Sequence, residues 1–353
     1  MSYNKMGILA NDVEFSLYND RYLNHHHSIL ISKESKIPIK AYTVDINMRN
    51  SNILSTMGEL FEREILINKN QNKKDEILGF SLIDGSIKSK PKREIIYVDK
   101  FVDSCGMASH TNSLELIKKA LFEFFERQCL ILSYLSKYPG FKIGEDILQN
   151  EEINRYRKYL NNFIDEVKFY NISLSTQLNV VLGIGFGYKN KCIGLGTSEN
   201  LLEAIKKSMQ EMLQYFFGSC SKNSSISNSN LLMEYEESNR DLYHAYFDSI
   251  TSQELNEEYE YLEKCAVANN IVQLNGFDIK KFIDDINTMQ RMEPYAFFFP
   301  NQRNLSNLKI LKICDFNWFP NLLPLTYSEE LYIKIENLVG RKLIRGCKYI
   351  PFP

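Results

Sequence analysis

The chain has 353 residues, of which 44% are hydrophobic and 24% are charged, so it can bury a large core and is not intrinsically disordered. Its 42 basic and 44 acidic residues leave a formal net charge of -2, which provides no overall attraction to nucleic acid or to an anionic membrane. The sequence contains neither a secretory signal nor a run of the roughly 20 apolar residues that a membrane span needs. The seven cysteines are widely spaced without a Cys-x-x-Cys pair, so we expect reduced thiols in a cytoplasmic protein.

In chain order, strand-like runs alternate with stretches of helical periodicity. Runs of β-branched and aromatic residues bounded by turn formers predict strands at 38–46, 94–99, 167–172, 180–188 and 192–196. Apolar residues at helical spacing predict helices at 52–68, 113–134 and 198–217. Loops are expected at 69–74, 86–92 and 218–230, and the sequence from 239 onward alternates helix-like and strand-like runs without a motif. The mixture predicts an α+β fold.

The first predicted helix contains Glu59-x-x-Glu62-Arg63. At about 100° per residue, the two glutamates lie one turn apart on the same face, with the arginine beside them. Taken alone, the motif is typical of a solvated helix face with an ion pair worth roughly 0.2–0.5 kcal/mol.

The second predicted helix repeats the motif as Glu123-x-x-Glu126-Arg127. Residues 120–135 are apolar nearly all round the helix, which is the pattern of a buried helix. A buried carboxylate without a partner costs several kcal/mol, so these acids need arginine, metal ions or both.

Glu115 extends this acidic stripe, because it lies eleven residues before Glu126 and therefore only about 20° away around the helix. The alternative is a capping box, with Asn112 as the N-cap and Glu115 at the third helical position.

The third predicted helix carries Glu211-x-x-Gln214, which a partly exposed face would also explain. Together the acids suit Mg²⁺, which takes oxygen ligands and shares them with phosphates, while Arg127 could hold phosphate oxygens in a fork. The glycines of Gly183-x-Gly-x-Gly187 and Gly194-x-Gly196 match no phosphate-loop motif and are interpreted as strand and turn glycines.

The ordered set Ser55-x-x-x-Glu59-x-x-Glu62-Arg63, Glu115-x7-Glu123-x-x-Glu126-Arg127 and Glu211-x-x-Gln214 resembles the ATP- and Mg²⁺-binding motifs of YcaO-domain enzymes. Within this family the chain resembles the cyclodehydratase subunit of microcin-type thiazole/oxazole synthetases. There, too, a Cys-Gly pair precedes the second motif, as Cys105-Gly106 does here, and the chain ends in Pro-Phe-Pro. The asparagine that the family has four residues before Glu115 is replaced here by Thr111, which favours the capping interpretation of Asn112.

The resemblance implies a YcaO-type α+β fold of mixed sheets, with helices whose acidic faces converge on a site for ATP and Mg²⁺. It implies a single domain over 1–353, with the ATP-site motifs in 50–217 and a C-terminal part, 218–353, that ends in a docked Pro-Phe-Pro tail. The ATP-binding residues that it implies are Ser55, Glu59, Glu62, Arg63, Asn112, Glu115, Glu123, Arg127 and Gln214. The metal ligands that it implies are Glu59, Glu62, Glu115, Glu123, Glu126 and Glu211. The catalytic tail that it implies is Pro351, Phe352 and Pro353.

The activity that the resemblance implies is ATP-dependent cyclodehydration of Cys, Ser or Thr in a ribosomally made precursor peptide. Thioamidation, macroamidine formation and a non-catalytic peptide-binding scaffold are the alternatives, and incidental ion pairs in a helical core are a further one. The expected partners are the precursor peptide, a leader-binding cyclodehydratase partner protein and an FMN-dependent azoline dehydrogenase. A homodimer within the complex is also conceivable, whereas nucleic acid and membrane are not expected.

Overall fold

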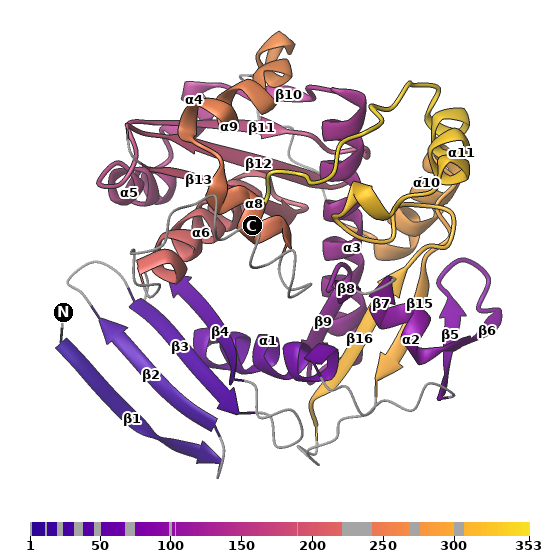
Figure 1. Ribbon diagram of the computed structural model, residues 1–353, viewed down its shortest axis with the longest axis horizontal. Helices are drawn as coiled ribbons and strands as arrows, with labels where there is room; N and C mark the ends of the chain where they lie inside the picture. The colour runs from indigo at the N-terminus through magenta and orange to yellow at the C-terminus, as the bar shows by residue number, and fades with distance from the viewer. Residues whose placement is uncertain are drawn as a thin grey trace. The chain divides into compact units, whose positions relative to one another are not determined.

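The computed structural model describes residues 2–10, 13–19, 24–31, 38–45, 51–67, 75–98, 101–102, 104–188, 190–220, 242–268, 276–299 and 307–353 (Figure 1). The chain divides into two compact units. The first unit comprises Met1–Phe124 with Pro294–Cys314, and the second comprises Phe125–Glu293 with Asp315–Pro353. The division falls within one continuous helix, α3 (Ser113–Ser136).

Two antiparallel sheets form most of the first unit. One has the order β1-β2-β3-β4 and the other has the order β6-β5-β15-β16-β9. The first sheet contains β1 (Ser2–Ala10), β2 (Val13–Asn19), β3 (Asn24–Ile31) and β4 (Pro38–Asp45). The second contains β5 (Glu76–Ser81), β6 (Ile87–Pro91), β9 (Met107–His110), β15 (Tyr295–Phe299) and β16 (Lys309–Cys314). The strands β7 (Tyr97–Val98) and β8 (Phe101–Val102) pair with each other.

Helix α1 (Ser51–Ile67) packs against β3, β4 and β9 of the first unit (Figure 1). Its apolar residues Phe61, Ile65 and Leu66 are buried in one cluster with residues of the second sheet, including Phe297 and Ile310. Burial of this apolar face leaves the acids of the helix, which are partly exposed, outside the apolar cluster.

The second unit is built on a mixed sheet of order β13-β12-β11-β10-β14. Its strands are β10 (Phe141–Ile143), β11 (Glu166–Asn171), β12 (Asn179–Phe186), β13 (Lys191–Ser198) and β14 (Val267–Ala268). The helices are α4 (Glu145–Leu148), α5 (Glu151–Leu160), α6 (Leu201–Cys220), α8 (Leu242–Ser249), α9 (Ser252–Glu258), α10 (Ile279–Gln290) and α11 (Glu329–Val339). Short 3-10 turns occur at Glu260–Lys264 and Pro324–Thr326.

Helix α6 lies directly on β12 and β13 (Figure 1). Gly183 and Gly194 face each other across the two strands, and Gly196 follows in β13. A Cβ atom at Gly194 would lie 2.1 Å from the Ser208 carbonyl oxygen of α6, so only glycine permits this approach. The interpretation of these residues as strand glycines is confirmed.

Most of the predicted elements are confirmed. The helices at 52–68, 113–134 and 198–217 correspond to α1, α3 and α6. The strands at 38–46, 167–172, 180–188 and 192–196 correspond to β4, β11, β12 and β13. No helix among the described residues combines the length and apolarity that crossing a membrane requires.

Two predictions of local structure are wrong. The strand at 94–99 is interrupted, because Lys92–Ile96 forms the short helix α2, in which Ile95 and Ile96 supply the buried side. The loop at 86–92 is largely β6, a strand that pairs with β5 and stands at the edge of the sheet among the described residues. Its lysines and proline are typical of an edge strand and resemble loop composition in a sequence. The loops expected at 69–74 and from 221 to 230 lie outside the described residues.

Candidate active site

Helix α1 places the first acidic motif in the first unit. Arg63 Nη2 lies 2.6 Å from Glu59 Oε1, which is the i,i+4 ion pair that helical spacing allows. The Arg63 side chain is 43% exposed, whereas the Glu59 side chain is 27% exposed. Ser55 is exposed one turn before Glu59 on the same helix. Because both side chains are partly exposed, the ion pair contributes little to the stability of the fold.

Glu62 of α1 has a strongly raised pKa. Desolvation raises its pKa to about 7, and the Glu59 carboxylate acts in the same direction. A hydrogen bond with Ser109 and the charges of Arg63 and Lys119 oppose this rise without cancelling it. Ser109 lies on β9, and a Cβ atom at Gly58 would meet its Oγ at 2.3 Å, so glycine permits the close approach of α1 to this strand.

The start of α3 has the geometry of a capped helix. Asn112 Oδ1 accepts hydrogen bonds from the N–H groups of Leu114 (2.9 Å) and Glu115 (3.2 Å). The Asn112 N–H donates to His110 Nδ1 at 2.9 Å. Asn112 and Glu115 are both exposed. The cap accounts for Asn112 Oδ1, and it places Glu115 in the first turn, where a carboxylate favours the helix dipole.

The central part of α3 is buried, as its sequence predicts. Its fully buried residues include Ala120, Leu121, Phe125, Cys129 and Leu130. Glu123 and Glu126, which lie one turn apart, are only partly exposed.

Arg127 is the best-placed cation of the candidate site. Its Nη2 lies 3.7 Å from Glu211 Oε1, and the two side chains are 16% and 30% exposed. The guanidinium carbon lies 4.8 Å from the centre of the Phe352 ring, which is within the range of a cation–π contact. Arg127, Glu211 and Phe352 come from three distant parts of the sequence, and the fold of the second unit brings them together.

Helix α6 and strand β13 position Glu211. Its Oε2 accepts a hydrogen bond from the Leu195 N–H of β13 at 2.5 Å. This bond depends on the close packing of α6 on the glycines of β13 described above. Gln214, one turn further along α6, is partly buried.

The C-terminal residues pack into the second unit. Phe352 is 1% exposed, and the Tyr259 hydroxyl donates to the Pro351 carbonyl oxygen at 3.3 Å. The Phe352 N–H donates to the Ile350 carbonyl oxygen at 2.8 Å. Pro351 is buried, and Pro353 is partly exposed.

The acidic side chains of the candidate site suit Mg²⁺, because this ion prefers carboxylate oxygens as ligands. Within the part of the chain that the structure describes, no three His, Cys, Asp or Glu side chains are grouped as a complete metal site. Mg²⁺ in nucleotide sites is usually held by one or two carboxylates together with phosphate oxygens and water. The residues therefore fit a nucleotide-borne Mg²⁺ better than an all-protein cage.

Several residues that support the site were not predicted from the sequence. Ser109 contacts Glu62, Leu195 holds Glu211 and Tyr259 holds Pro351. Ser109 lies three residues before the predicted N-cap Asn112, but nothing in its position indicates a contact with Glu62. The other two act through a backbone N–H group and an isolated tyrosine, which no local pattern distinguishes.

Solved structures with a similar fold cover most or all of the chain. A chain of the E. coli microcin synthetase McbBCD complex with pro-MccB17 bound matches over 100% of both chains, with a TM-score of 0.72 and 15% identity. YcaO from Methanopyrus kandleri, bound with AMPPCP and Mg²⁺, matches with a TM-score of 0.65 and 10% identity over 86% of this chain and 85% of that chain. A heterocyclase in complex with substrate and cofactor matches with a TM-score of 0.70 and 11% identity over 96% of this chain and 55% of that chain. At these identities the likeness concerns the fold.

A local similarity connects the chain to the heat-inducible transcription repressor HrcA of Phytoplasma mali (strain AT). The two are 32% identical over 139 residues, which is 37% of this chain and 38% of that protein. The chain thus matches little more than a third of the length of this curated relative, and the similarity assigns no activity to it.

The sequence profile of the YcaO cyclodehydratase family, described as ATP- and Mg²⁺-binding, matches residues 54–291, which is well over half of the chain. The predictions of the family, the α+β YcaO-type fold class and ATP and Mg²⁺ as its cofactors are confirmed. The chain belongs to the YcaO cyclodehydratase family.

Proposed function

We propose that this protein is an ATP-dependent peptide cyclodehydratase that forms thiazolines or oxazolines from Cys, Ser or Thr residues of a ribosomally made precursor peptide. The observation that carries the proposal is the contact of Arg127 with both Glu211 and Phe352. It joins two of the predicted nucleotide-site motifs to the terminal Pro-Phe-Pro that resembles the tail of azoline-forming family members.

The reaction balances with ATP as the only co-substrate. The side-chain sulfur or oxygen attacks the preceding peptide carbonyl carbon, loses its proton and leaves a hemiorthoamide oxyanion. That oxygen attacks the γ-phosphorus of ATP and displaces ADP. The C–O bond then breaks with release of phosphate, the nitrogen lone pair forms the C=N bond, and the amide proton is lost. Phosphorylation makes the amide oxygen a leaving group, which explains why a dehydration needs a nucleotide.

The acidic, basic and neutral residues of the site have different roles in the proposed reaction. The carboxylates of Glu59, Glu62, Glu115, Glu123, Glu126 and Glu211 hold Mg²⁺ directly or through water. Mg²⁺, when bound, neutralises phosphate charge and orients the γ-phosphoryl group. Arg63 and Arg127 neutralise phosphate oxygens, and Ser55, Asn112 and Gln214 hydrogen-bond the nucleotide. Pro351, Phe352 and Pro353 act at the peptide side of the site, and Phe352 screens Arg127 from water.

Function in a complex follows from the same proposal. We expect the chain to act on the precursor peptide together with a leader-binding partner protein, and an FMN-dependent dehydrogenase would oxidise azolines to azoles. The McbBCD complex with pro-MccB17 bound supports this arrangement by likeness of fold.

Calorimetric titration of the purified chain with ATP, with and without Mg²⁺, tests the nucleotide site. We expect binding that requires Mg²⁺ and weakens at least about tenfold, or about 1.4 kcal/mol, in both Glu123→Gln and Glu126→Gln. Glu203→Gln is the matched control, because Glu203 is an exposed acid of α6 that pairs with Lys206. Wild-type binding that is insensitive to Mg²⁺, or no binding with and without the partner protein, would contradict the proposal.

The mass of a modified precursor peptide distinguishes the chemistries of the family. Each cyclodehydration removes one water, whereas thioamidation exchanges oxygen for sulfur. We expect losses of water that stop when the Cys, Ser and Thr residues of the peptide are replaced by alanine. A sulfur-for-oxygen mass change would instead support thioamidation.

A further inference from the structure

The last thirteen residues form a segment without helix or strand, and several attachments hold it in the second unit. It follows α11, which ends in a left-handed cap at Gly340 (φ 65°), whose N–H donates to the Glu336 carbonyl oxygen at 2.8 Å. One attachment is to α11 itself, another is to the end of α3, and another is at Phe352.

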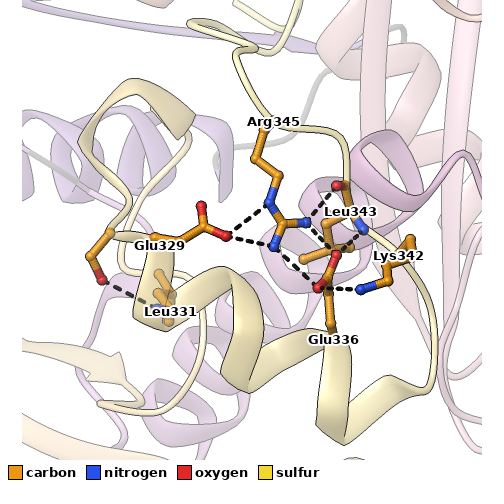
Figure 2. Close-up of polar contacts among 7 residues, drawn as sticks. Glu329, Leu331, Glu336, Lys342, Leu343 and Arg345 are labelled. Carbon is orange, nitrogen blue, oxygen red and sulfur yellow. Dashed lines mark hydrogen bonds and ion pairs between the residues drawn. The ribbon is translucent and has the colours of Figure 1, made fainter.

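The attachment to α11 is a clasp made by Glu336 and Arg345 (Figure 2). Arg345 Nη2 lies 3.1 Å from Glu336 Oε2, and Arg345 Nη1 contacts Glu336 Oε1, so the guanidinium binds the carboxylate in a fork. Glu336 Oε1 also accepts the Leu343 N–H at 2.8 Å, and Arg345 Nη1 donates to the Leu343 carbonyl oxygen at 2.8 Å. Both backbone groups of Leu343 are thereby bound to the ion pair.

Glu329 completes the clasp from the first turn of α11. Its Oε1 accepts from Arg345 Nη2 at 2.9 Å and from Arg345 Nε at 3.2 Å (Figure 2). The Glu336 side chain is only 7% exposed, and Arg345 together with the Leu343 N–H holds its pKa at about 2. Lys342 also reaches Glu336 at 3.4 Å, but the Lys342 side chain is 92% exposed. The clasp is therefore charged at neutral pH, and Glu336 is its least exposed member.

Beyond the clasp, the segment runs beside α3. The Ile344 N–H donates to the Leu135 carbonyl oxygen at 2.7 Å near the end of α3, and Phe352 contacts Arg127 eight residues earlier on the same helix. Eight helical residues rise about 12 Å, whereas the eight residues from Ile344 to Phe352 could extend to about 26–29 Å. The number of residues between Ile344 and Phe352 therefore does not by itself fix where Phe352 lies along α3.

The middle of the segment has contacts of its own, because the Lys348 carbonyl oxygen accepts the Leu325 N–H at 3.2 Å and the centre of the Tyr349 ring lies 5.2 Å from that of the Tyr246 ring. Residues 344–349 line an open pocket of about 640 Å³ together with Tyr134, Lys137, Tyr246 and Glu258. Gly346 adopts φ 79° with open space around its Cα. The segment is thus held at several points, and the clasp is an attachment made by ion pairs.

We propose that the Glu336–Arg345 clasp is a positioning device: it sets the register of the C-terminal segment along α3 and so keeps Phe352 on Arg127. The proposal rests on the proposed function, in which Phe352 and Arg127 belong to the active site. Glu336 and Arg345 themselves touch neither nucleotide nor peptide and act through the tail.

Hydrogen exchange of the C-terminal segment tests the register directly. In Arg345→Gln, we expect the amides of Ile344 and Phe352 to exchange at least about tenfold faster than in the wild type, while the amides of α6 keep their protection. Lys342→Gln is the matched control, because it removes an exposed cation from the same carboxylate, and it should stay within about twofold of the wild type. Unchanged protection of both amides in Arg345→Gln would overturn the proposal.

Magnesium-dependent hydrolysis of ATP by the same proteins tests the consequence for the site. We expect Arg345→Gln to lower kcat about tenfold with little change in the KM for ATP, and Arg345→Lys, which cannot form the fork, to recover only part of the loss. If the clasp acts through Phe352, combining Arg345→Gln with Phe352→Ala should cost no more than Phe352→Ala alone. Additive losses, or a wild-type kcat in Arg345→Gln, would contradict the proposal. A wild-type chain that neither binds nor hydrolyses ATP would instead overturn the proposed function.

Discussion

Among the single residues of the candidate site, Glu62 carries a clear electrostatic cost. Its pKa lies at about 7 instead of the ordinary 4.5, because desolvation and the Glu59 carboxylate outweigh Ser109, Arg63 and Lys119. Between these two values the folded state holds a proton that the unfolded state has lost. The free energy of unfolding therefore decreases as pH rises from about 4.5 to 7 and levels off above that.

Replacing Glu62 with glutamine should remove this cost. In the absence of nucleotide, we expect Glu62→Gln to raise the urea midpoint at pH 8 and to leave it nearly unchanged at pH 4.5, because only the charged form is penalised. Glu64→Gln on the same helix is the control. A midpoint at pH 8 below that of the wild type would show that the Glu62 carboxylate stabilises the fold, as a purely structural acid would.

Gln128, in contrast to Glu62, is a buried polar residue whose hydrogen bonds stabilise the fold. Its Nε2 donates to the Phe319 carbonyl oxygen at 2.9 Å, and its Oε1 accepts the Phe319 N–H at 3.1 Å, in a fully buried setting. We expect Gln128→Leu to lower the free energy of unfolding by roughly 2–6 kcal/mol, since two backbone groups lose their partners and each costs about 1–3 kcal/mol. Chemical denaturation measures this, and a loss under about 1 kcal/mol would mean that water replaces the amide.

At the scale of elements, the approach of α6 to β13 decides where Glu211 lies. A Cβ atom at Gly196 would come within 2.2 Å of the Ala204 carbonyl oxygen. This oxygen belongs to the backbone of α6, so no rotation of a side chain can relieve the clash. The motif Glu211-x-x-Gln214 predicts a helix face, but the glycines bring that face within reach of the Leu195 N–H.

Gly196→Ala should therefore affect both stability and the nucleotide site. We expect a loss of about 1–3 kcal/mol or more in unfolding free energy and weaker binding of Mg²⁺ and ATP, because α6 must move away from β13. Gly187→Ala is the control, since the nearest atom to its Cβ would be 3.1 Å away. Wild-type stability in Gly196→Ala would show that α6 can shift at no cost.

At the scale of the whole molecule, the single-domain prediction for 1–353 can be tested through the thiols. Cys105 lies in the first unit and Cys192 in the second, and both are buried, whereas Cys265 is partly exposed. Because α3 supplies residues to both units, we expect Cys105 and Cys192 to become reactive over the same range of urea concentration, while Cys265 reacts without urea. Thiol labelling read by mass spectrometry separates the three sites, and two distinct ranges would contradict a single cooperative domain.

The sequence by itself determined the family, the three helices that carry the acidic motifs and most of the strands. These features depend on residues close together in the chain, where helical and strand periodicity can be read directly. It misjudged residues 86–99, because an edge strand rich in lysine and a five-residue helix rich in isoleucine have the composition of a loop and of a strand.

Only the tertiary structure decided which of these residues meet. Ser109 beside Glu62, Phe352 on Arg127 and Arg345 on Glu336 are contacts between segments that no local pattern links. The physical reason is that the packing of apolar faces and the glycines between α6 and β13 set the distances, while the polar motifs only say which groups are available. The acids were therefore predictable as a set, and their partners were not.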